Sequence, residues 1–187
     1  MNQKNILHEY HKIVGFDSKN ARQLIKKLDY KNDHYLLQCI AQTYLDECRF
    51  NNNGTQRLNF DKKKGMLAEK YIMRAYEINP NCPDVLWVFA KVRETTQQFN
   101  LAILYYKKII NLGIKNIVYA GCKLELKIAE ELINDSKFEL YRLYFNLNPV
   151  ISRKYLSLYK KGLRHGVHTI YKPLAKYLII PSSTFKL

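Results

Sequence analysis

Two pairs of histidines have the spacing in this sequence that comes closest to a metal site. His8 and His11 form one H-x-x-H pair, and His165 and His168 form the other. On a helix this spacing brings two imidazoles to one side, but a metal needs further ligands, and no carboxylate lies near the second pair. The stretch HEYHK misses the H-E-x-x-H motif of zinc proteases by one residue, because Lys12 stands where the second histidine belongs. We therefore interpret these histidines as structural and predict no metal site.

Other patterns that would carry catalysis are missing from the sequence. There is no glycine-rich phosphate loop and no G-x-S-x-G nucleophile motif. A run of acidic residues comes closest to a cluster, but lysines are interleaved with it, which favours a solvated helix face. The acidic residues are Glu125, Glu130, Glu131 and Asp135, and the lysines are Lys123, Lys127 and Lys137. We predict no catalytic residues, no cofactor and no enzymatic activity.

Composition favours one helical domain that folds without disulfide bonds or bound metal ions. A chain of 187 residues with 47% hydrophobic residues can bury a substantial core. Only 7 glycines and 5 prolines suit short connections between helices better than the many turns of a β protein. The longest apolar run, residues 85–90, is too short for a membrane span, and the N-terminus is too polar for a signal peptide.

The four cysteines have no metal-binding spacing. They are Cys39, Cys48, Cys82 and Cys122, and no two of them form a C-x-x-C pair. We interpret them as reduced, mostly buried thiols, which is typical of a cytoplasmic protein.

Positive charge dominates the chain and is concentrated near its end. Lys and Arg number 31 against 16 Asp and Glu, so the formal net charge is +15. After Glu139 the chain contains nine Lys or Arg and no carboxylate side chain. Such a protein attracts nucleic acid, anionic lipid or an acidic protein, and charge alone does not choose among them.

Helical periodicity defines the N-terminal elements. Ala21, Leu24, Ile25 and Leu28 share one face of a segment that Asp17 or Ser18 would cap. A further helix follows residues 32–33, and its apolar stripe runs to residue 45. Residues 51–65 have the composition of a loop.

The middle of the chain contains an internal repeat. Residues 68–80 align with residues 102–114 at an offset of 34 residues. Ala68 matches Ala102, and Tyr71 matches Tyr105. A period of 34 is typical of helix-turn-helix repeats that stack side by side.

These residues resemble the tetratricopeptide repeat family. Ala68, Ile72, Ala75 and Pro80 occupy the family's positions in the second helix of a repeat. Leu86, Phe89 and Ala90 occupy positions of a first helix, although Arg93 replaces the family's aromatic residue, and Leu37, Ile40, Ala41 and Tyr44 fit a first helix upstream. The resemblance is best over 66–112, is partial over 34–50, and is least over 117–149, where Ser136 and Glu139 would cap a further helix.

The resemblance implies an all-α, right-handed helix-turn-helix repeat stack, that is, a short α-solenoid. The repeat domain would span residues 1–150, with an N-terminal helical extension at 1–32 and an insertion loop at 51–65. Residues 151–187 would form a basic capping helix and tail, with a break bracketed by Gly162 and Gly166. An irregular helical bundle with chance periodicity is the alternative.

The resemblance also implies a binding groove. Trp87 falls at a position that faces the family's concave groove, where it would anchor a peptide together with Lys91. A local shift in register would instead place Trp87 in the core. The clamp with which the family grips a terminal carboxylate is not supported, because Gln38, Gln42 and Val88 occupy the corresponding positions.

The carboxylate-free segment supplies a predicted basic surface. Ile151, Tyr155, Leu158 and Tyr159 would form one apolar face of a helix over 151–161, with the charges mostly off that face. The basic residues are Arg153, Lys154, Lys160, Lys161, Arg164, Lys172 and Lys176. Four interpretations stay open for them: a cap without a dedicated ligand, a site for an acidic protein, a nucleic-acid site, and contact with an anionic membrane surface.

The sequence therefore predicts a non-catalytic, cytoplasmic scaffold or adaptor. It would bind a protein or peptide through the groove and the basic surface. A nucleic-acid-binding protein that uses the helices as a support is the first alternative. A repeat module appended to a larger enzyme or assembly is the second.

Overall fold

Helices account for most of the described chain. The computed structural model describes residues 2–50, 60–119 and 126–167. Over those residues it contains eight α-helices, which confirms the predicted all-α class. They are α1 (Gln3–Ile13), α2 (Ser18–Lys26), α3 (His34–Arg49), α4 (Lys62–Ile78), α5 (Pro83–Thr95), α6 (Phe99–Tyr119), α7 (Leu126–Tyr144) and α8 (Pro149–Arg164). None of the helices in this described part has the length and apolarity needed to span a membrane.

Local sequence signals fix where most of these helices begin. Five helices start after an Asn or Asp whose side-chain oxygen accepts a hydrogen bond from a backbone N–H of the first turn. Pro83 and Pro149 stand at the start of α5 and α8, where a missing N–H costs nothing. The capping residues are Asn2, Asp17, Asp33, Asp61 and Asn148.

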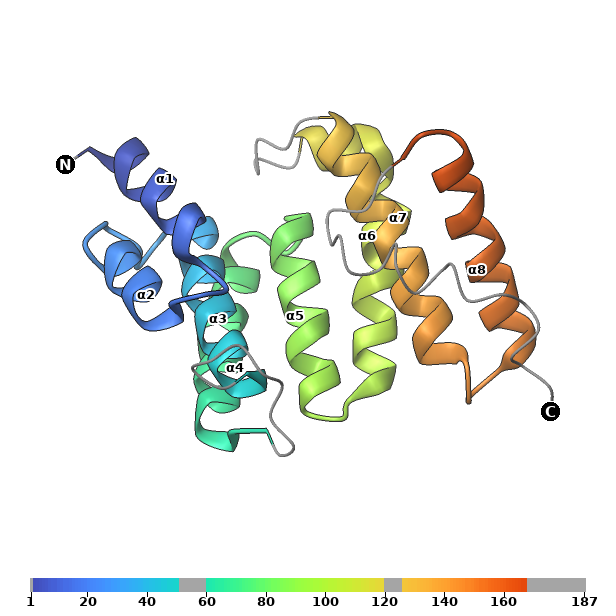
Figure 1. Cartoon of the computed structure of the whole chain (residues 1–187), viewed down its shortest axis with the longest axis horizontal. Coiled ribbons are helices and arrows are strands. Elements are labelled where there is room, and N and C mark those ends of the chain that lie inside the picture. Colours follow the sequence, from blue (N-terminus) through green and yellow to red (C-terminus); the bar gives the residue numbers. More distant parts are fainter. Residues whose placement is uncertain (1, 51–59, 120–125, 168–187) are drawn as a thin grey trace.

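The helices pack mostly against their neighbours in the chain. The most extensive packing joins α3 with α4, α5 with α6, α6 with α7, and α7 with α8. Helix α2 packs on both α1 and α3, and α3 also touches α5. In Figure 1 the helices follow one another along the long axis of the molecule, from α1 and α2 at one end to α8 at the other.

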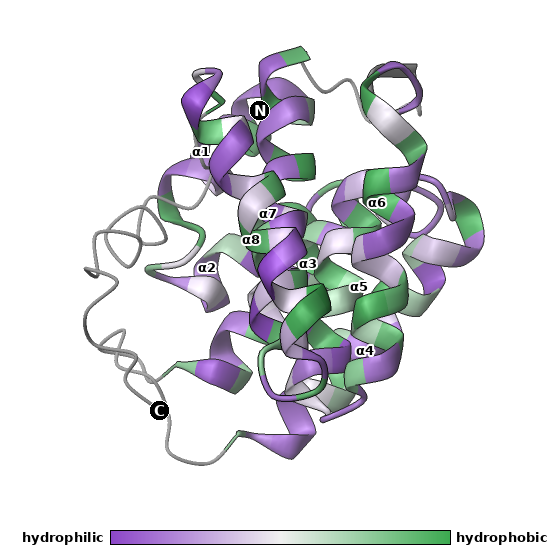
Figure 2. Ribbon diagram, turned by 90° about the vertical axis from the view of Figure 1, so that its right-hand side faces the viewer, coloured by the Kyte–Doolittle hydropathy of each residue, from purple (hydrophilic) through white to green (hydrophobic). Residues whose placement is uncertain are grey.

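Small side chains allow these helices to approach closely. Ala68, Ala75, Ala90 and Ala102 are all fully buried, as their positions in the repeat pattern predict. Larger apolar side chains such as Ile72 fill the space between the helix pairs. Figure 2 shows hydrophobic residues gathered on the central helices, α5 among them. One continuous core therefore runs through the molecule.

The predicted loop at 51–65 is too long at its C-terminal end. Asp61 caps α4 through a hydrogen bond of 3.1 Å from the backbone N–H of Lys64, so the helix already begins at Lys62. The three consecutive lysines made this segment look like a loop, although Lys is a good helix former. Residues 51–59 lie outside the described part of the chain.

The helix boundaries predicted within 117–149 are wrong. No helix starts at Ser136, because α7 passes through it without a break and the Ser136 hydroxyl donates a hydrogen bond to the carbonyl of Leu132. The capping-box pattern is therefore only a local coincidence inside a long helix. The interruption lies instead in α6 at Gly113, whose positive φ of 68° kinks the helix.

The capping helix is longer than the predicted 151–161 and ends within the break that Gly162 and Gly166 were predicted to bracket. It runs from Pro149 to Arg164, and the chain turns only at Gly166, which has a φ of 77°. Gly162 serves close packing, since a Cβ there would lie 2.6 Å from Cγ of the Asn134 side chain on α7. Helix α8 therefore packs tightly on α7.

Candidate functional site

The outward side of α8 gathers the predicted basic residues. Arg153, Lys154, Lys160, Lys161 and Arg164 are all exposed. Helical geometry of 3.6 residues per turn places them within an arc of about 120°, with the exposed Ser157 among them. We call these six residues the basic face. Lys172 and Lys176 lie outside the described residues.

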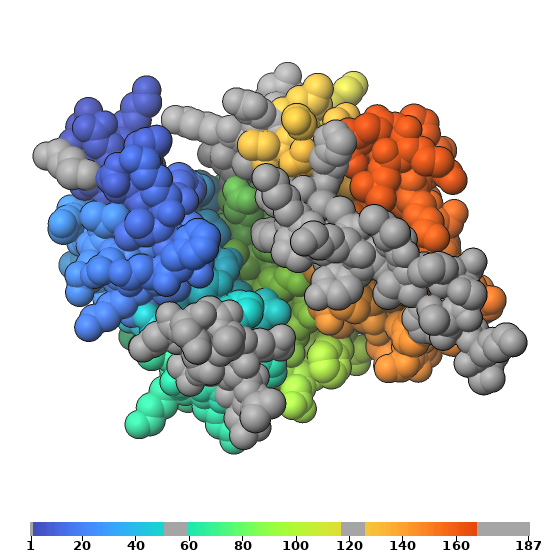
Figure 3. Space-filling view, viewed as in Figure 1, coloured from blue at the N-terminus to red at the C-terminus, as the bar shows by residue number. Residues whose placement is uncertain are grey.

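The opposite side of α8 is packed on the rest of the protein. Tyr159 is fully buried, and its ring lies 5.1 Å from that of Phe138. Tyr155 stacks on Tyr144 of α7 with the planes only 8° apart. The Ser152 hydroxyl donates a hydrogen bond of 2.9 Å to the carbonyl of Tyr141. These contacts hold the helix with its basic face exposed. Figure 3 shows α8 at the end of the molecule opposite α1.

Positive charge accumulates at this end of the molecule. The pKa of Lys137 on α7 is lowered, first by partial burial and then by the nearby ammonium of Lys161. The chain has no carboxylate after Glu139, and Glu139 itself is buried. The basic face therefore has no acidic residue on its own helix to balance it.

Several carboxylates elsewhere in the described chain have structural roles. Asp17, Asp33 and Asp61 cap helices. Others pair with cations of the protein itself: Glu47 with Arg22 and Lys64, Glu69 with Arg93, and Glu94 and Glu139 with Lys91 and Arg142. Asp135, predicted to lie on a solvated face, is completely buried, so that prediction is wrong for this residue. Few carboxylates are left to offset the surface cations.

Trp87 lies in the core. Its side chain is only 4% exposed, and its ring meets that of Tyr106 edge to face at 5.2 Å. This burial agrees with the interpretation that a shift in register places Trp87 in the core. Little of the ring is accessible to a peptide. Its role in partner binding stays a prediction.

Lys91 belongs to a network of charges that links α5, α6 and α7. Its ammonium lies 2.7 Å from a carboxylate oxygen of Glu139 and 3.4 Å from one of Glu94. Arg142 pairs with the same two carboxylates. The Tyr106 hydroxyl donates a hydrogen bond of 2.6 Å to Glu94. Lys91 is thus engaged inside the protein, and its role in a groove also stays a prediction.

Comparison of the chain with known proteins identifies no relative that has these surfaces. No protein-family model, no curated protein and no solved structure matches this chain. The resemblance to tetratricopeptide repeats therefore stays a prediction from the quoted residues.

Two of these histidines make hydrogen bonds within the protein. His11 Nε2 lies 2.9 Å from the hydroxyl of Tyr35, and His165 Nδ1 lies 2.7 Å from the carbonyl of Lys161. His168 lies outside the described residues. Within the described ranges no three His, Cys, Asp or Glu side chains come together so that they could hold a metal ion.

A second group of titratable residues escaped the sequence analysis. Burial raises the pKa of Asp84 at the start of α5 to about 6. It also raises the pKa of Cys39 on α3 to about 12, with a smaller contribution from the charge of Asp84. Asp46, on the same helix as Cys39, has a pKa raised to about 6 by burial, although a hydrogen bond from Gln42 opposes the shift. Sequence offered no signal, because these positions are polar residues within amphipathic helices.

The cysteines follow the prediction only in part. Cys39 and Cys48 are free and buried, as expected. Cys82 is buried but disulfide-bonded, so the prediction of a reduced thiol is wrong for this residue. Cys122 lies outside the described part. A disulfide is uncommon in a reducing compartment, and the cytoplasmic location stays a prediction.

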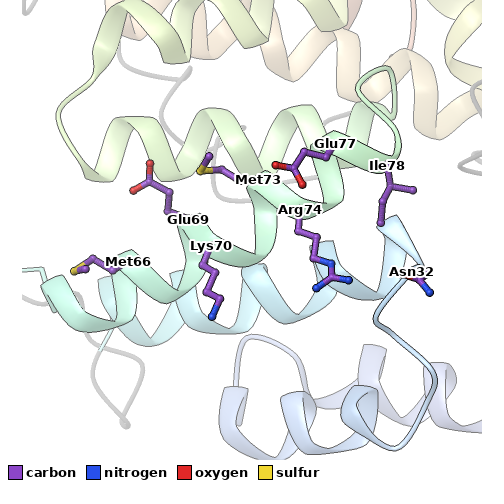
Figure 4. A pocket seen from close by; sticks show the side chains of 8 residues that line it. All are labelled: Asn32, Met66, Glu69, Lys70, Met73, Arg74, Glu77 and Ile78. Atoms are coloured by element: carbon purple, nitrogen blue, oxygen red, sulfur yellow. The ribbon is translucent and has the colours of Figure 1, made fainter.

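An open depression of about 760 Å³ lies on the outer face of α4. Figure 4 shows that all but one of its lining side chains come from this helix, the exception being Asn32. Met66 and Met73 are exposed there, with acidic and basic side chains between them. The depression is not enclosed by a second helix, and its polar side chains do not point toward one another. We therefore assign no ligand to it.

Proposed function

We propose that this protein is a non-catalytic adaptor that binds an acidic protein partner through the basic face of α8. The observation that carries the proposal is the set of five exposed cations on one side of a helix that has no carboxylate. A solvated helix normally mixes the two signs of charge, because pairs of opposite charge stabilise it and like charges four residues apart do not. An anionic partner would relieve that repulsion.

The use of carboxylates elsewhere supports the same proposal. Seven acidic side chains of the described chain cap helices or pair with cations inside the protein. These internal ion pairs nearly cancel, so the net charge of +15 is carried largely by the rest of the chain. A positive surface of this kind accelerates encounters with anionic partners, and the effect weakens as salt rises.

The packing of the tyrosines favours a protein over single-stranded nucleic acid. Single-strand binding sites combine cations with exposed aromatic rings on which bases stack. On α8 the Tyr159 ring is fully buried and the Tyr155 ring is stacked against Tyr144, so neither supplies such a platform. The basic face offers cations alone.

The helix pairs would act as the scaffold for this surface. We propose that they form a tetratricopeptide-like stack, which is supported by the packing of α3 on α4, of α5 on α6, and of α3 on α5. Arg93 replaces the aromatic residue of the repeat pattern and pairs with Glu69 of the preceding helix, so an ion pair would substitute for an aromatic contact. The groove role of Trp87 and Lys91 is not part of the proposal, because both side chains have contacts inside the protein.

Ser157 offers a sharp test, because it lies in the middle of the basic face. Ser157→Glu would place a carboxylate within one helical turn of Arg153, Lys154, Lys160 and Lys161. Helix stability should be kept or slightly raised by the new ion pairs, while binding to an acidic partner should fall at least tenfold. Ser157→Ala is the matched control that changes the side chain without the charge. Affinity is measured by fluorescence anisotropy with a labelled 14-residue polyglutamate peptide, and folding by circular dichroism.

A pair of double variants separates local charge from total charge. Arg153→Glu with Lys154→Glu changes the basic face, whereas Lys62→Glu with Lys63→Glu makes the same change in net charge at exposed positions on α4. Only the first should abolish binding. Equal losses in the two variants would show that bulk charge does the binding and would refute an α8 site. The protein could instead bind single-stranded DNA or RNA more tightly than polyglutamate and lose that binding in the Ser157→Glu variant. The basic face would then be a nucleic-acid site.

A further inference from the structure

Three apolar side chains are exposed at the beginning of α8. Phe145 is 45% exposed, Leu147 is 60% exposed, and Val150 is 69% exposed. They fall within six consecutive residues, in the turn between α7 and α8 and in the first turn of α8. Single exposed apolar residues are ordinary on protein surfaces, but a group of this kind beside a charged surface marks a binding site more often.

The apolar group meets the basic face at Val150. Val150 precedes Arg153 by three residues and Lys154 by four, which is the spacing of neighbours on one side of a helix. Following α8 from its beginning, a ligand would meet apolar side chains first and then cations over the next three turns. At a rise of 1.5 Å per residue, the distance from Val150 to Arg164 is about 21 Å.

We propose, resting on the function proposed above, that the ligand is an acidic peptide segment with an apolar anchor at one end. The anchor would pack on Phe145, Leu147 and Val150, and its carboxylates would meet the cations of the basic face. The order of groups along α8 fixes the order along the ligand. A segment of about 14 residues if helical, or about 6 if extended, would cover this distance.

The surroundings of α8 favour a peptide over a membrane surface. A helix that lies in a membrane interface buries a wide apolar face among lipids. On α8 that face is already used, since Tyr159 and Ser152 are buried and Tyr155 packs against α7. Only a small apolar group remains, which suits one or two anchoring side chains.

Nucleic acid fits the apolar end poorly. Phe145 is one exposed ring on which a base could stack, but Leu147 and Val150 are aliphatic and offer none. A protein segment can present apolar and acidic side chains in sequence, and the small apolar area would then add affinity to the electrostatic contacts.

The test compares three fluorescein-labelled 14-residue peptides by anisotropy at fixed salt. The first has leucines at positions 1 and 4 and glutamates at positions 7, 8, 11 and 14, with glutamines elsewhere. The second has serines in place of the leucines, and the third keeps the composition of the first but places the leucines at the centre. We expect the first to bind about tenfold more tightly than the other two.

A variant of the protein locates the effect. Leu147→Ser with Val150→Ser should remove the tenfold advantage while leaving affinity for the serine peptide unchanged. Met66→Ser is the matched control, because Met66 is 70% exposed on the distant α4 and should have no influence. Circular dichroism of each variant reports whether the fold is kept.

The outcomes distinguish this inference from the proposed function. If the three peptides bind with equal affinity and all of them lose affinity for the Ser157→Glu variant, the acidic site stands. The proposal of an apolar anchor is then refuted. If none of the peptides binds, both proposals fail. If vesicles containing phosphatidylserine, or single-stranded DNA, bind in a manner that depends on Leu147 and Val150, the peptide inference is overturned in favour of that ligand.

Discussion

At the scale of single residues, Gly162 shows how closely two helices can approach. The side chain of Asn134 occupies the space where a Cβ of residue 162 would lie, and its amide donates a hydrogen bond of 3.3 Å to the carbonyl of Tyr159. Asn134 is only 1% exposed, so it has little room to move. The glycine is required here for space.

Gly162→Ala should therefore destabilise the protein. Overpacking a tight site costs about 1–3 kcal/mol, which outweighs the gain in helix propensity of about 1 kcal/mol from replacing a glycine. Gly65→Ala is the matched control, because the nearest atom to its new Cβ would be the Cys48 sulfur at an ordinary 3.5 Å. This control should be neutral or stabilising. Urea unfolding curves measure both, and equal effects of the two substitutions would contradict the role assigned to close packing.

Asp84 is predicted to make stability depend on pH. Its pKa is raised to about 6 in the folded protein, so the folded state binds a proton more tightly than the unfolded chain does. The resulting contribution to the free energy of unfolding is complete below about pH 4 and is lost as pH rises through about 6.

Asp84→Asn should raise stability at pH 7 by up to about 3 kcal/mol and flatten the dependence between pH 4 and 7. Asp29→Asn, at an exposed position, serves as the control and should leave the profile unchanged. Unfolding by urea at a series of pH values provides the measurement. An unchanged slope in Asp84→Asn would show that this carboxyl is not the group that titrates.

At the scale of elements, the charge network of Lys91, Glu94, Glu139 and Arg142 joins α5 to α7. Burial and the two nearby cations act in opposite directions on Glu94, and its pKa is lowered overall, so it remains charged at neutral pH. Glu139 lies between Lys91 and Arg142 and is 4% exposed. Removing it would leave two cations with one shared carboxylate.

Glu139→Gln should destabilise the protein by about 2 kcal/mol. The cost is below the 3–5 kcal/mol typical of a broken buried pair, because Glu94 remains as a partner. Adding Lys91→Met should recover part of the loss, since it removes the cation left without its nearest carboxylate. A double-mutant cycle in urea measures the coupling, and additive effects would show that the two side chains do not interact.

At the scale of the whole molecule, net positive charge opposes folding through self-repulsion. Salt screens this repulsion between exposed cations, whereas partly buried pairs such as Arg22 with Glu47 are screened much less. Because salt weakens the repulsion more than it weakens these pairs, we expect salt to stabilise the protein.

Raising NaCl from about 0.05 to 0.5 M should increase Tm by about 2–4 °C, which corresponds to about 1 kcal/mol for a chain of this length. Parallel melts in KCl separate ionic strength from effects of a particular ion. A Tm that falls with salt would mean that attractive pairs dominate over repulsion among the surface cations.

Sequence by itself determined the helices and most of the packing residues. Periodicity predicted α3 and most of α4 and α5, and Asp17 caps α2 as predicted, because these signals act between residues a few positions apart. The exposed cations of α8 also followed from periodicity, since an apolar stripe on one side of a helix leaves the charges on the other.

Tertiary structure decided what depends on contacts between distant residues. Only packing against Tyr106 shows that Trp87 is buried, and only the approach of α7 to α5 shows that Lys91 is paired with Glu139. Ser136 looked like a helix start because its local pattern is that of a cap, while the continuous burial of α7 overrode it. The apolar group before the basic face emerged in the same way, since exposure of Leu147 and Val150 is set by what the neighbouring helices leave uncovered.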